Sequence, residues 1–169
     1  WVLLYLTCLY SGILVIPLDK ALQEGEIINS IKRVRPDAVF VDKNNLPKIE
    51  NITETEMIPN IFSLDDEAEN SLYKIMEEGS KVPTYKRNEF ITKEIDPDET
   101  KILVFTSGTT AQSKIVMLSN RNLVENVLGM QRMINFEVGS ATMLILPLHH
   151  VFASTGTLYF LFSGITGTF

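Results

Sequence analysis

Residues 106–114 place hydroxyl side chains, one glycine and a lysine in the order expected of an anion-binding loop. The hydroxyl residues around Gly108 are Thr106, Ser107, Thr109 and Thr110, and Lys114 ends the segment. Backbone N–H groups of such a loop converge on an anion, the hydroxyls add donors, and the lysine adds a mobile positive charge. This combination predicts a cradle for the phosphates of a nucleotide. The alternative is an ordinary turn between strands, because Ser, Thr and Gly are common in turns.

The loop does not match the Walker loop of nucleoside triphosphatases, G-x-x-x-x-G-K-[ST]. Gly108 and Lys114 have the right separation, but Ser113 replaces the second glycine and Ile115 replaces the hydroxyl residue that binds Mg²⁺. A Walker-type NTPase is therefore not expected. The apolar residues 101–105 before the loop predict a buried strand, and residues 115–118 predict a second strand after it.

Residues 105–110, Lys114 and residues 118–123 resemble the phosphate-loop signature of AMP-forming acyl-CoA synthetases and their relatives, which include luciferases and peptide-synthetase adenylation domains. Residues 14–19 resemble a strand of the same domain. The positions that depart from the signature are Ala111, Ser113, Ile115 and Asn120, where the family usually has glycine, proline, glycine and histidine. These departures leave the expected fold intact but bear on catalytic efficiency.

The resemblance implies an α/β fold of parallel βαβ units and the ATP-dependent activation of a carboxylate. In that reaction the carboxylate attacks the α-phosphate of MgATP to give an acyl-adenylate and pyrophosphate, and the thiol of CoA then takes the acyl group. ATP, Mg²⁺ and CoA are the implied cofactors. The implied substrate is a small-molecule carboxylate, and long-chain fatty acids are among the candidates. The residues implied to bind the β- and γ-phosphates are Thr106, Ser107, Gly108, Thr109, Thr110 and Lys114.

Both histidines of the chain follow residues 141–146, which predict a buried strand. Ligands of open α/β sheets bind beyond the carboxyl ends of strands, so His149 and His150 are candidates for a site, against ordinary core or surface roles. A metal site is not expected from the pair, because adjacent side chains in an extended chain point apart. Residues 146–152 resemble a second family motif, which implies that His150 lies beside the acyl carboxylate and the α-phosphate, whereas His149 is structural.

The composition is that of a folded, acidic chain. Hydrophobic residues make up 45% of the 169 residues, and the net charge of −6 argues against nucleic acid as a partner. The single cysteine, Cys8, is consistent with the reducing cytoplasm. Because both ends of the chain fall inside apolar runs, we interpret the sequence as a fragment of a longer protein. The resemblance implies that residues 1–169 are part of a single AMP-binding (adenylation) N-terminal domain.

The remaining pattern predicts alternating helices and strands. Helices are expected at residues 2–10, 24–34, 44–50, 70–78, 120–134 and 151–162, and strands at 13–16, 38–41, 58–64 and from 165 onward. Strands 13–16 and 38–41 with the helix between them predict a parallel βαβ unit. Residues 80–100 are polar and are expected to form a surface connector whose carboxylates at 94–99 are solvated rather than bound to a metal.

Residues 1–18 and 151–169 carry no charge and are long enough to be candidates for transmembrane helices. Gly12 interrupts the first run, and glycines and hydroxyl residues weaken the second, so buried helices are favoured. Peripheral association with a membrane is a further expectation. On the helix at 151–162, the resemblance makes Phe152, Gly156 and Tyr159 candidates to line an acyl pocket, against ordinary core packing.

Other functions remain open beside that of a CoA ligase. The departures at Ala111, Ser113 and Ile115 motivate a non-catalytic relative that binds a nucleotide or a lipid. An adenylation domain for amino or aryl acids would carry the same motifs. A membrane protein built on the uncharged runs is a third alternative.

Overall fold

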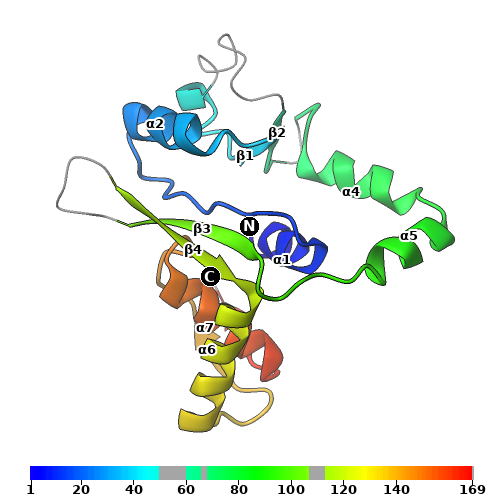
Figure 1. Cartoon of the computed structure of the whole chain (residues 1–169), viewed down its shortest axis with the longest axis vertical. Coiled ribbons are helices and arrows are strands. Elements are labelled where there is room, and N and C mark those ends of the chain that lie inside the picture. Colours follow the sequence, from blue (N-terminus) through cyan, green and yellow to red (C-terminus); the bar gives the residue numbers. More distant parts are fainter. Residues whose placement is uncertain (50–59, 66–67, 107–112, 169) are drawn as a thin grey trace. The chain divides into compact units, whose positions relative to one another are not determined.

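The computed structural model describes residues 1–49, 60–65, 68–106 and 113–168 of the chain. The chain has an α/β architecture and divides into two compact units (Figure 1). One unit comprises Trp1 and Lys20–Lys93, and the other comprises Val2–Asp19 and Glu94–Phe169. Each unit contains its own apolar core.

The unit that contains Lys20–Lys93 has a short parallel sheet. Its elements are α2 (Glu24–Val34), β1 (Val39–Val41), β2 (Ile61–Ser63), α4 (Leu72–Ser80) and α5 (Thr84–Ile91). Strands β1 and β2 run parallel, and the rings of Phe40 and Phe62 stack across the pair with centroids 5.1 Å apart. Ile27 and Ile31 lie on one face of α2 and are buried together with Ile49.

Helix α2 has the bounds that its apolar spacing predicts. At its start, the Glu26 carboxylate accepts a hydrogen bond from the Gln23 backbone N–H at 2.9 Å, as part of a capping box. At its end, Arg35 adopts a left-handed conformation (φ 46°), and its N–H donates to the Ile31 carbonyl at 2.7 Å. Pro36 follows and cannot continue the helix.

The strand pairing and some helix bounds of this unit differ from the expectations. Strand β1 pairs with β2 and not with residues 13–16, which belong to the other unit. The polar stretch at residues 80–100 contains helix α5, whose exposed residues leave no apolar stripe from which to predict it. Helix α4 begins after its N-cap Ser71 and continues through Gly79. Of the helix expected at 44–50, residues 47–49 are helical and follow a turn, and residue 50 lies outside the described residues.

The unit that contains Glu94–Phe169 is built around an antiparallel hairpin of β3 and β4. Its elements are α1 (Val2–Ser11), β3 (Thr100–Thr106), β4 (Lys114–Ser119), α6 (Asn120–Met133), β5 (Ala141–Met143), α7 (Val151–Phe162) and β6 (Thr166–Thr168). Helices α6 and α7 pack beside each other and against the hairpin (Figure 1). The buried residues of this core are Ile102, Leu123, Val127, Leu158 and Tyr159.

Glycines end α1 and α7 where the sequence predicts a break. After α7, Gly164 has φ +67°, and the Ile165 N–H donates to the Phe160 carbonyl at 2.9 Å. After α1, Gly12 has φ +68°, and the next N–H, that of Ile13, donates to a carbonyl of the last turn at 2.9 Å. Glycine enters this left-handed conformation freely, which lets the last carbonyls of each helix find donors.

Strands β5 and β6 form a parallel pair joined through α7, which is the βαβ arrangement that the sequence predicts for this fold class. The buried strand expected at 141–146 is shorter, because β5 ends at Met143 and Ile145 is 78% exposed. Among the described strands, β5 pairs with β6 alone, so the other edge of β5 has no neighbouring strand in this part of the structure. The strand expected at 13–16 is reduced to a bridge at Val15, and Ile13 is exposed.

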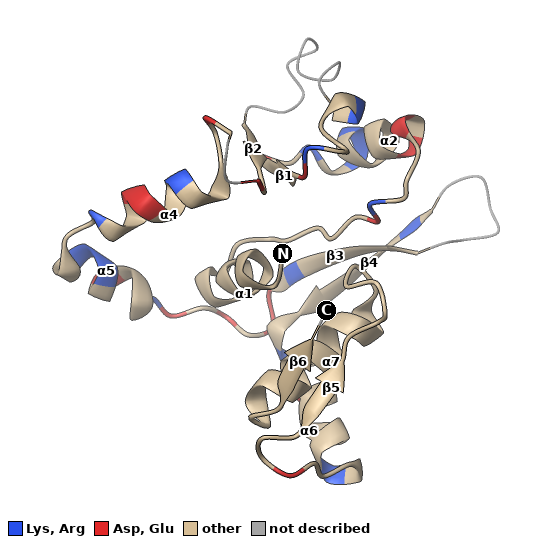
Figure 2. Cartoon of the chain, turned by 180° about the vertical axis from the view of Figure 1, so that it is seen from behind, with Lys and Arg blue, Asp and Glu red and all other residues tan. Residues whose placement is uncertain are grey.

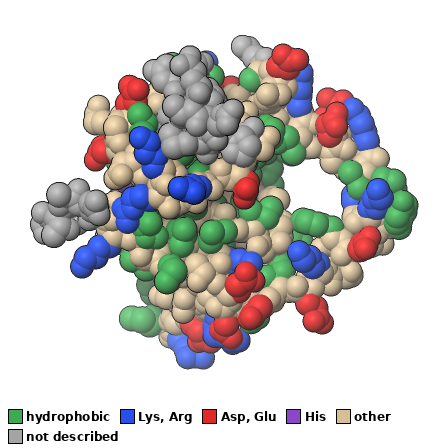
Figure 3. All heavy atoms as spheres, turned by 45° about the horizontal axis from the view of Figure 1, so that its top comes forward, with side chains coloured by type: hydrophobic (Ala, Val, Ile, Leu, Met, Phe, Trp, Pro, Cys, Tyr) green, Lys and Arg blue, Asp and Glu red, His purple; other side chains and the backbone are tan. Residues whose placement is uncertain are grey.

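Charged residues are unevenly distributed. Strand β5, helix α7 and strand β6 carry no Lys, Arg, Asp or Glu, whereas α4 and α5 carry both signs (Figure 2). On the face shown in Figure 3, basic and acidic side chains are interspersed with hydrophobic ones. None of the helices in the described ranges is both long and apolar enough to cross a membrane.

Candidate functional site

The phosphate-loop segment begins and ends on the β3–β4 hairpin. Thr106 is the last residue of β3, Lys114 is the first residue of β4, and the two lie directly opposite each other in the strand register. The Thr106 hydroxyl donates to the Lys114 carbonyl at 3.5 Å. Because side chains alternate along a strand, both residues lie on the same face as buried Ile102, which packs against α6 and α7. Lys114 is exposed, so its ammonium group is accessible at the base of the loop.

The middle of the loop cannot be placed in the same way. The predicted phosphate-binding residues Ser107, Gly108, Thr109 and Thr110, and the departure at Ala111, lie outside the described residues. Ile115 is described: it is half-buried in β4, opposite Phe105. A β-branched side chain is favourable in a strand, so the hairpin accommodates isoleucine where the family usually has glycine.

A second segment runs along the edge of β3 that β4 does not occupy. The Val15 N–H donates to the Lys101 carbonyl at 2.8 Å, and the Leu103 N–H donates to the Val15 carbonyl at 3.0 Å. This bridge is parallel, so the chain after Val15 advances in the direction of β3 (Figure 1). Val15 and Ile102 are paired in this bridge, and Asp19 lies as many residues after Val15 as Thr106 lies after Ile102. Asp19 therefore lies toward the carboxyl end of β3.

His149 and His150 occupy a turn between β5 and α7. The His150 N–H donates to the Pro147 carbonyl at 3.0 Å, and the two imidazole centroids are 4.1 Å apart. The expectation that adjacent side chains point apart is wrong here, because the chain turns instead of extending. His149 Nε2 lies 3.6 Å from Asp19 Oδ2. The structure thus brings the histidine pair and Asp19 together.

The two histidines have different surroundings. The His149 side chain is 16% exposed, whereas His150 is exposed and is the N-cap residue of α7. Burial lowers the pKa of His149, while the Asp19 carboxylate raises it and His150 lowers it further. His149 is therefore mainly neutral at neutral pH. The His150 imidazole makes no capping hydrogen bond to the described backbone of α7, and it lies at the positive end of the helix dipole.

Asp19 is the member of this group that the motifs alone did not single out. In the sequence it is the last residue of the segment 14–19 that resembles a family strand. The signal that would have identified it is an acidic side chain just beyond an apolar run, because the carboxyl ends of strands are where α/β sheets bind ligands.

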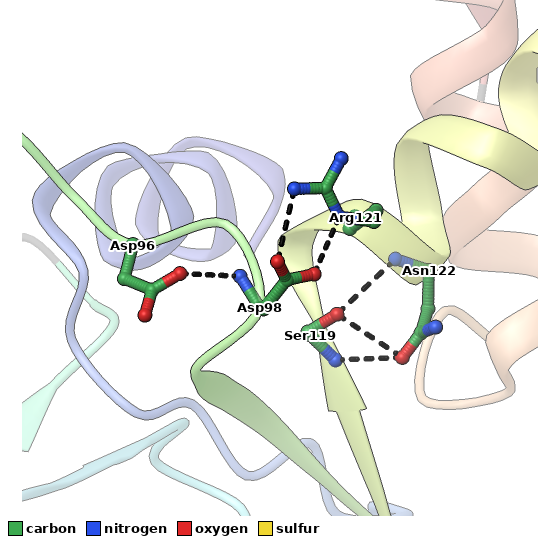
Figure 4. A network of polar contacts seen from close by, with 5 residues as sticks. All are labelled: Asp96, Asp98, Ser119, Arg121 and Asn122. Carbon is green, nitrogen blue, oxygen red and sulfur yellow. Dashed lines mark hydrogen bonds and ion pairs between the residues drawn. The ribbon is translucent and has the colours of Figure 1, made fainter.

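The acidic run before β3 has a structural role in the described contacts (Figure 4). The Arg121 guanidinium donates to both carboxylate oxygens of Asp98, which holds the pKa of Asp98 below its usual value. The Asp96 carboxylate accepts from the Asp98 N–H at 2.9 Å, and Ser119 caps α6 together with Asn122. These contacts tie the segment to the start of α6. Among the described residues, no group of at least three His, Cys, Asp or Glu residues has the geometry to hold a metal ion.

The candidates for the acyl pocket differ in their burial. Phe152 is 72% exposed, whereas Gly156 is buried inside α7. Tyr159 is 2% exposed, its hydroxyl donates to the Ile134 carbonyl, and its ring centroid is 6.2 Å from that of Phe136. These contacts favour core packing for Tyr159.

Proteins with similar sequences include luciferases and CoA ligases. The chain is 29% identical to luciferin 4-monooxygenase of Photuris pensylvanica over 89% of this chain and 29% of that protein. It is 26% identical to the mitochondrial medium-chain acyl-CoA ligase ACSF2 of Danio rerio over 92% of this chain and 29% of that protein. It is 22% identical to 4-coumarate–CoA ligase 4 of Arabidopsis thaliana over 88% of this chain and 27% of that protein. The chain therefore spans less than a third of the length of these relatives.

Solved structures share the fold. The ATP-bound MatB of Rhodopseudomonas palustris superposes with a TM-score of 0.81 at 24% identity, over 99% of this chain and 32% of that one. A red-emitting luciferase of Phrixothrix hirtus gives a TM-score of 0.79 at 21% identity, over 94% of this chain and 31% of that one. The sequence model of the AMP-binding enzymes matches residues 1–169. The chain belongs to this family of AMP-binding, adenylate-forming enzymes.

Proposed function

We propose that the chain forms part of an ATP-dependent, AMP-forming carboxylate–CoA ligase. The observation that carries the proposal is the β3–β4 hairpin, which holds Thr106 and Lys114 at the two ends of a loop with the family's phosphate signature. Membership of the AMP-binding enzymes supports ATP as a substrate. The CoA ligases among the relatives favour CoA as the acceptor of the acyl group.

In this proposal the loop binds the outer phosphates of ATP. Lys114 is exposed at the base of the loop, so its ammonium group contributes a mobile charge to the β- and γ-phosphates. The hydroxyl of Thr106 and the loop residues Ser107, Gly108, Thr109 and Thr110 are assigned to the same phosphates from the motif. Mg²⁺ enters with ATP as part of the substrate, and we assign no step to a metal held by the protein.

His150 orients the reacting groups. An oxygen of the carboxylate attacks the α-phosphorus, the bond from that phosphorus to the bridging oxygen breaks, and pyrophosphate leaves. The sulfur of CoA then attacks the acyl carbon, loses its proton and displaces AMP. His150 is exposed at the amino end of α7, where a hydrogen bond from its imidazole and the helix dipole both favour an anion.

The direct test is carboxylate-dependent exchange of labelled pyrophosphate into ATP by the full protein. A panel of fatty, aryl and amino acids separates the alternatives. Exchange with fatty or aryl acids, followed by thioester formation with CoA, supports the ligase. Exchange restricted to amino acids would indicate an amino-acid adenylation domain. Failure of every acid in the panel would favour the non-catalytic relative that the departures at Ala111, Ser113 and Ile115 motivate.

Substitution of Lys114 tests the phosphate assignment. Loss of one charge-assisted contact costs about 1.5–3 kcal/mol, so Lys114→Ala should raise the KM for ATP by roughly 10–100-fold and change the KM for the acid much less. Lys86→Ala, which removes an exposed lysine of α5, is the matched control. Unchanged kinetics in both variants would make Lys114 an ordinary surface lysine.

Substitution of the histidines tests the second assignment. His150→Ala should lower the adenylation rate while the protein remains folded, because the side chain is exposed. The loss of one positioned hydrogen-bonding group typically lowers such rates by about 100–1,000-fold. A larger kinetic defect in His149→Ala than in His150→Ala would show that the roles of the two histidines are reversed.

A further inference from the structure

We propose that Asp19 is a positioning residue for the histidine pair: its carboxylate orients the ring of His149, which in turn holds the ring of His150. The inference rests on the proposed function, in which His150 contacts the reacting groups. Asp19 itself is not assigned a contact with ATP or with the acid.

The contacts form a short chain of three side chains. Asp19 Oδ2 lies 3.6 Å from His149 Nε2, and the His149 ring lies 4.1 Å, centroid to centroid, from the His150 ring at a tilt of 42°. The middle residue is the most enclosed, since the His149 side chain is 16% exposed and the Asp19 side chain is 39% exposed. A ring enclosed between a carboxylate and a second ring has little freedom to turn.

The topology explains why these residues meet. Asp19 reaches the carboxyl end of β3 because the segment from Val15 runs parallel to that strand. The histidines reach Asp19 through the turn that precedes α7. Residues 138–168 carry no Lys, Arg, Asp or Glu, so no side chain of these four types from this part of the chain competes with Asp19 for His149.

The physical effect is on orientation and tautomer. A carboxylate beside Nε2 favours the tautomer of His149 that carries its proton on that nitrogen, and it favours one of the two ring orientations. Carboxylates that fix histidines at metal sites change affinity or activity by about 10–100-fold when they are removed. Because Asp19 acts on His150 through His149, we expect an effect at the lower end of that range, about tenfold.

The experiment compares Asp19→Asn, Asp19→Glu and Glu137→Gln in the full protein, by pyrophosphate exchange at saturating and limiting ATP. Glu137 is an exposed carboxylate of the same unit, so its variant controls for the loss of one negative charge. We expect Asp19→Asn to lower kcat about tenfold with less than a twofold change in the KM for ATP, Asp19→Glu to restore part of kcat, and Glu137→Gln to match the wild type.

A double-mutant cycle separates positioning from general destabilisation. In a His149→Gln background, Asp19→Asn should have no further effect on kcat, because the route to His150 has already been removed. Multiplying defects in the double variant would mean that Asp19 acts independently of His149, and they would overturn the inference. A wild-type kcat in Asp19→Asn would overturn it as well and would leave the proposed ligase function intact.

A measurement that needs no activity completes the test. Histidine signals in ¹H–¹³C spectra, assigned by the loss of peaks in His149→Gln and His150→Gln, give the pKa of His149 directly. Without the Asp19 carboxylate this pKa should fall, because the negative charge of Asp19 raises it in the wild type. If the wild type shows no pyrophosphate exchange, the proposed function fails. Separately, an unchanged His149 titration in Asp19→Asn would show that the two side chains do not interact, and it would overturn the inference.

Discussion

Replacing Tyr159 by phenylalanine tests whether this residue is part of the core or of an acyl pocket. Tyr159 is 2% exposed, and its hydroxyl donates to the carbonyl of Ile134, the residue that ends α6. The bond therefore joins α7 to the end of α6. Phenylalanine keeps the ring and its packing against Phe136 and Phe160 but removes the donor.

The expected loss of stability is moderate. A typical intramolecular hydrogen bond contributes about 0.5–1.5 kcal/mol net, and a buried acceptor left without a donor costs about 1–3 kcal/mol. The Ile134 residue is 45% exposed, so water can reach its surroundings and the second cost should be small. The variant should therefore lose about 1–2 kcal/mol of unfolding free energy, and no cavity cost adds to this because the ring is retained.

Urea denaturation measures the loss, and hydrogen exchange of residues 120–134 and 151–162 shows whether it is confined to α6 and α7. Tyr85→Phe is the control, since Tyr85 is 68% exposed on α5. The preference for acids of different chain length should not change in Tyr159→Phe. Unaltered stability together with a changed preference would refute the core assignment and return Tyr159 to the acyl pocket.

The remaining predictions concern backbone strain and pH. Arg35 has a left-handed backbone conformation (φ 46°), which costs a residue with a side chain about 1–2 kcal/mol. Arg35→Gly avoids this cost but loses more entropy on folding, so it should stabilise the protein by up to about 1 kcal/mol in urea denaturation. Arg35→Ala should show no such gain. Gly164→Ala should destabilise by about 1–2 kcal/mol, since the residue has φ +67° and a methyl group would lie 3.3 Å from Val138. The hydrogen bonds from Arg121 lower the pKa of Asp98, so the stability that this ion pair contributes is present above about pH 4 and is lost as the pH falls through the folded-state pKa. Asp98→Asn should therefore reduce the loss of unfolding free energy at acidic pH. The same loss in the variant as in the wild type would contradict the ion pair. The pKa of His149 is lowered, so protonation favours the unfolded chain and stability should fall as pH drops below about 6.5; His149→Gln should remove that step.

The elements with strong local signals were predictable from the sequence. The bounds of α2 follow from the spacing of Ile27 and Ile31 and from Pro36, and the end of α7 follows from Gly164. These signals depend on residues within one or two turns of each other, so they need no knowledge of the rest of the fold. The two strands beside the loop were predictable for a similar reason, because a loop signature stands between two apolar runs. Their antiparallel pairing was seen only in the structure.

The pairing of elements and the surroundings of the histidines were decided by tertiary structure. Whether β1 pairs with β2 or with residues 13–16 depends on long-range contacts, because both segments contain apolar residues that suit a strand. Helix α5 has no apolar face and leaves no pattern to detect.

The contact between Asp19 and His149 is the clearest example of an arrangement that only the tertiary structure decided. The two residues lie far apart in the chain, and they meet because a parallel bridge at Val15 directs one of them, and a turn before α7 directs the other, to the same end of β3. The sequence by itself determined that this chain carries the loop and histidine motifs of its family. Which histidine is enclosed, and by which carboxylate, was decided by the tertiary structure, since burial and ring orientation are set by neighbours that no local spacing specifies.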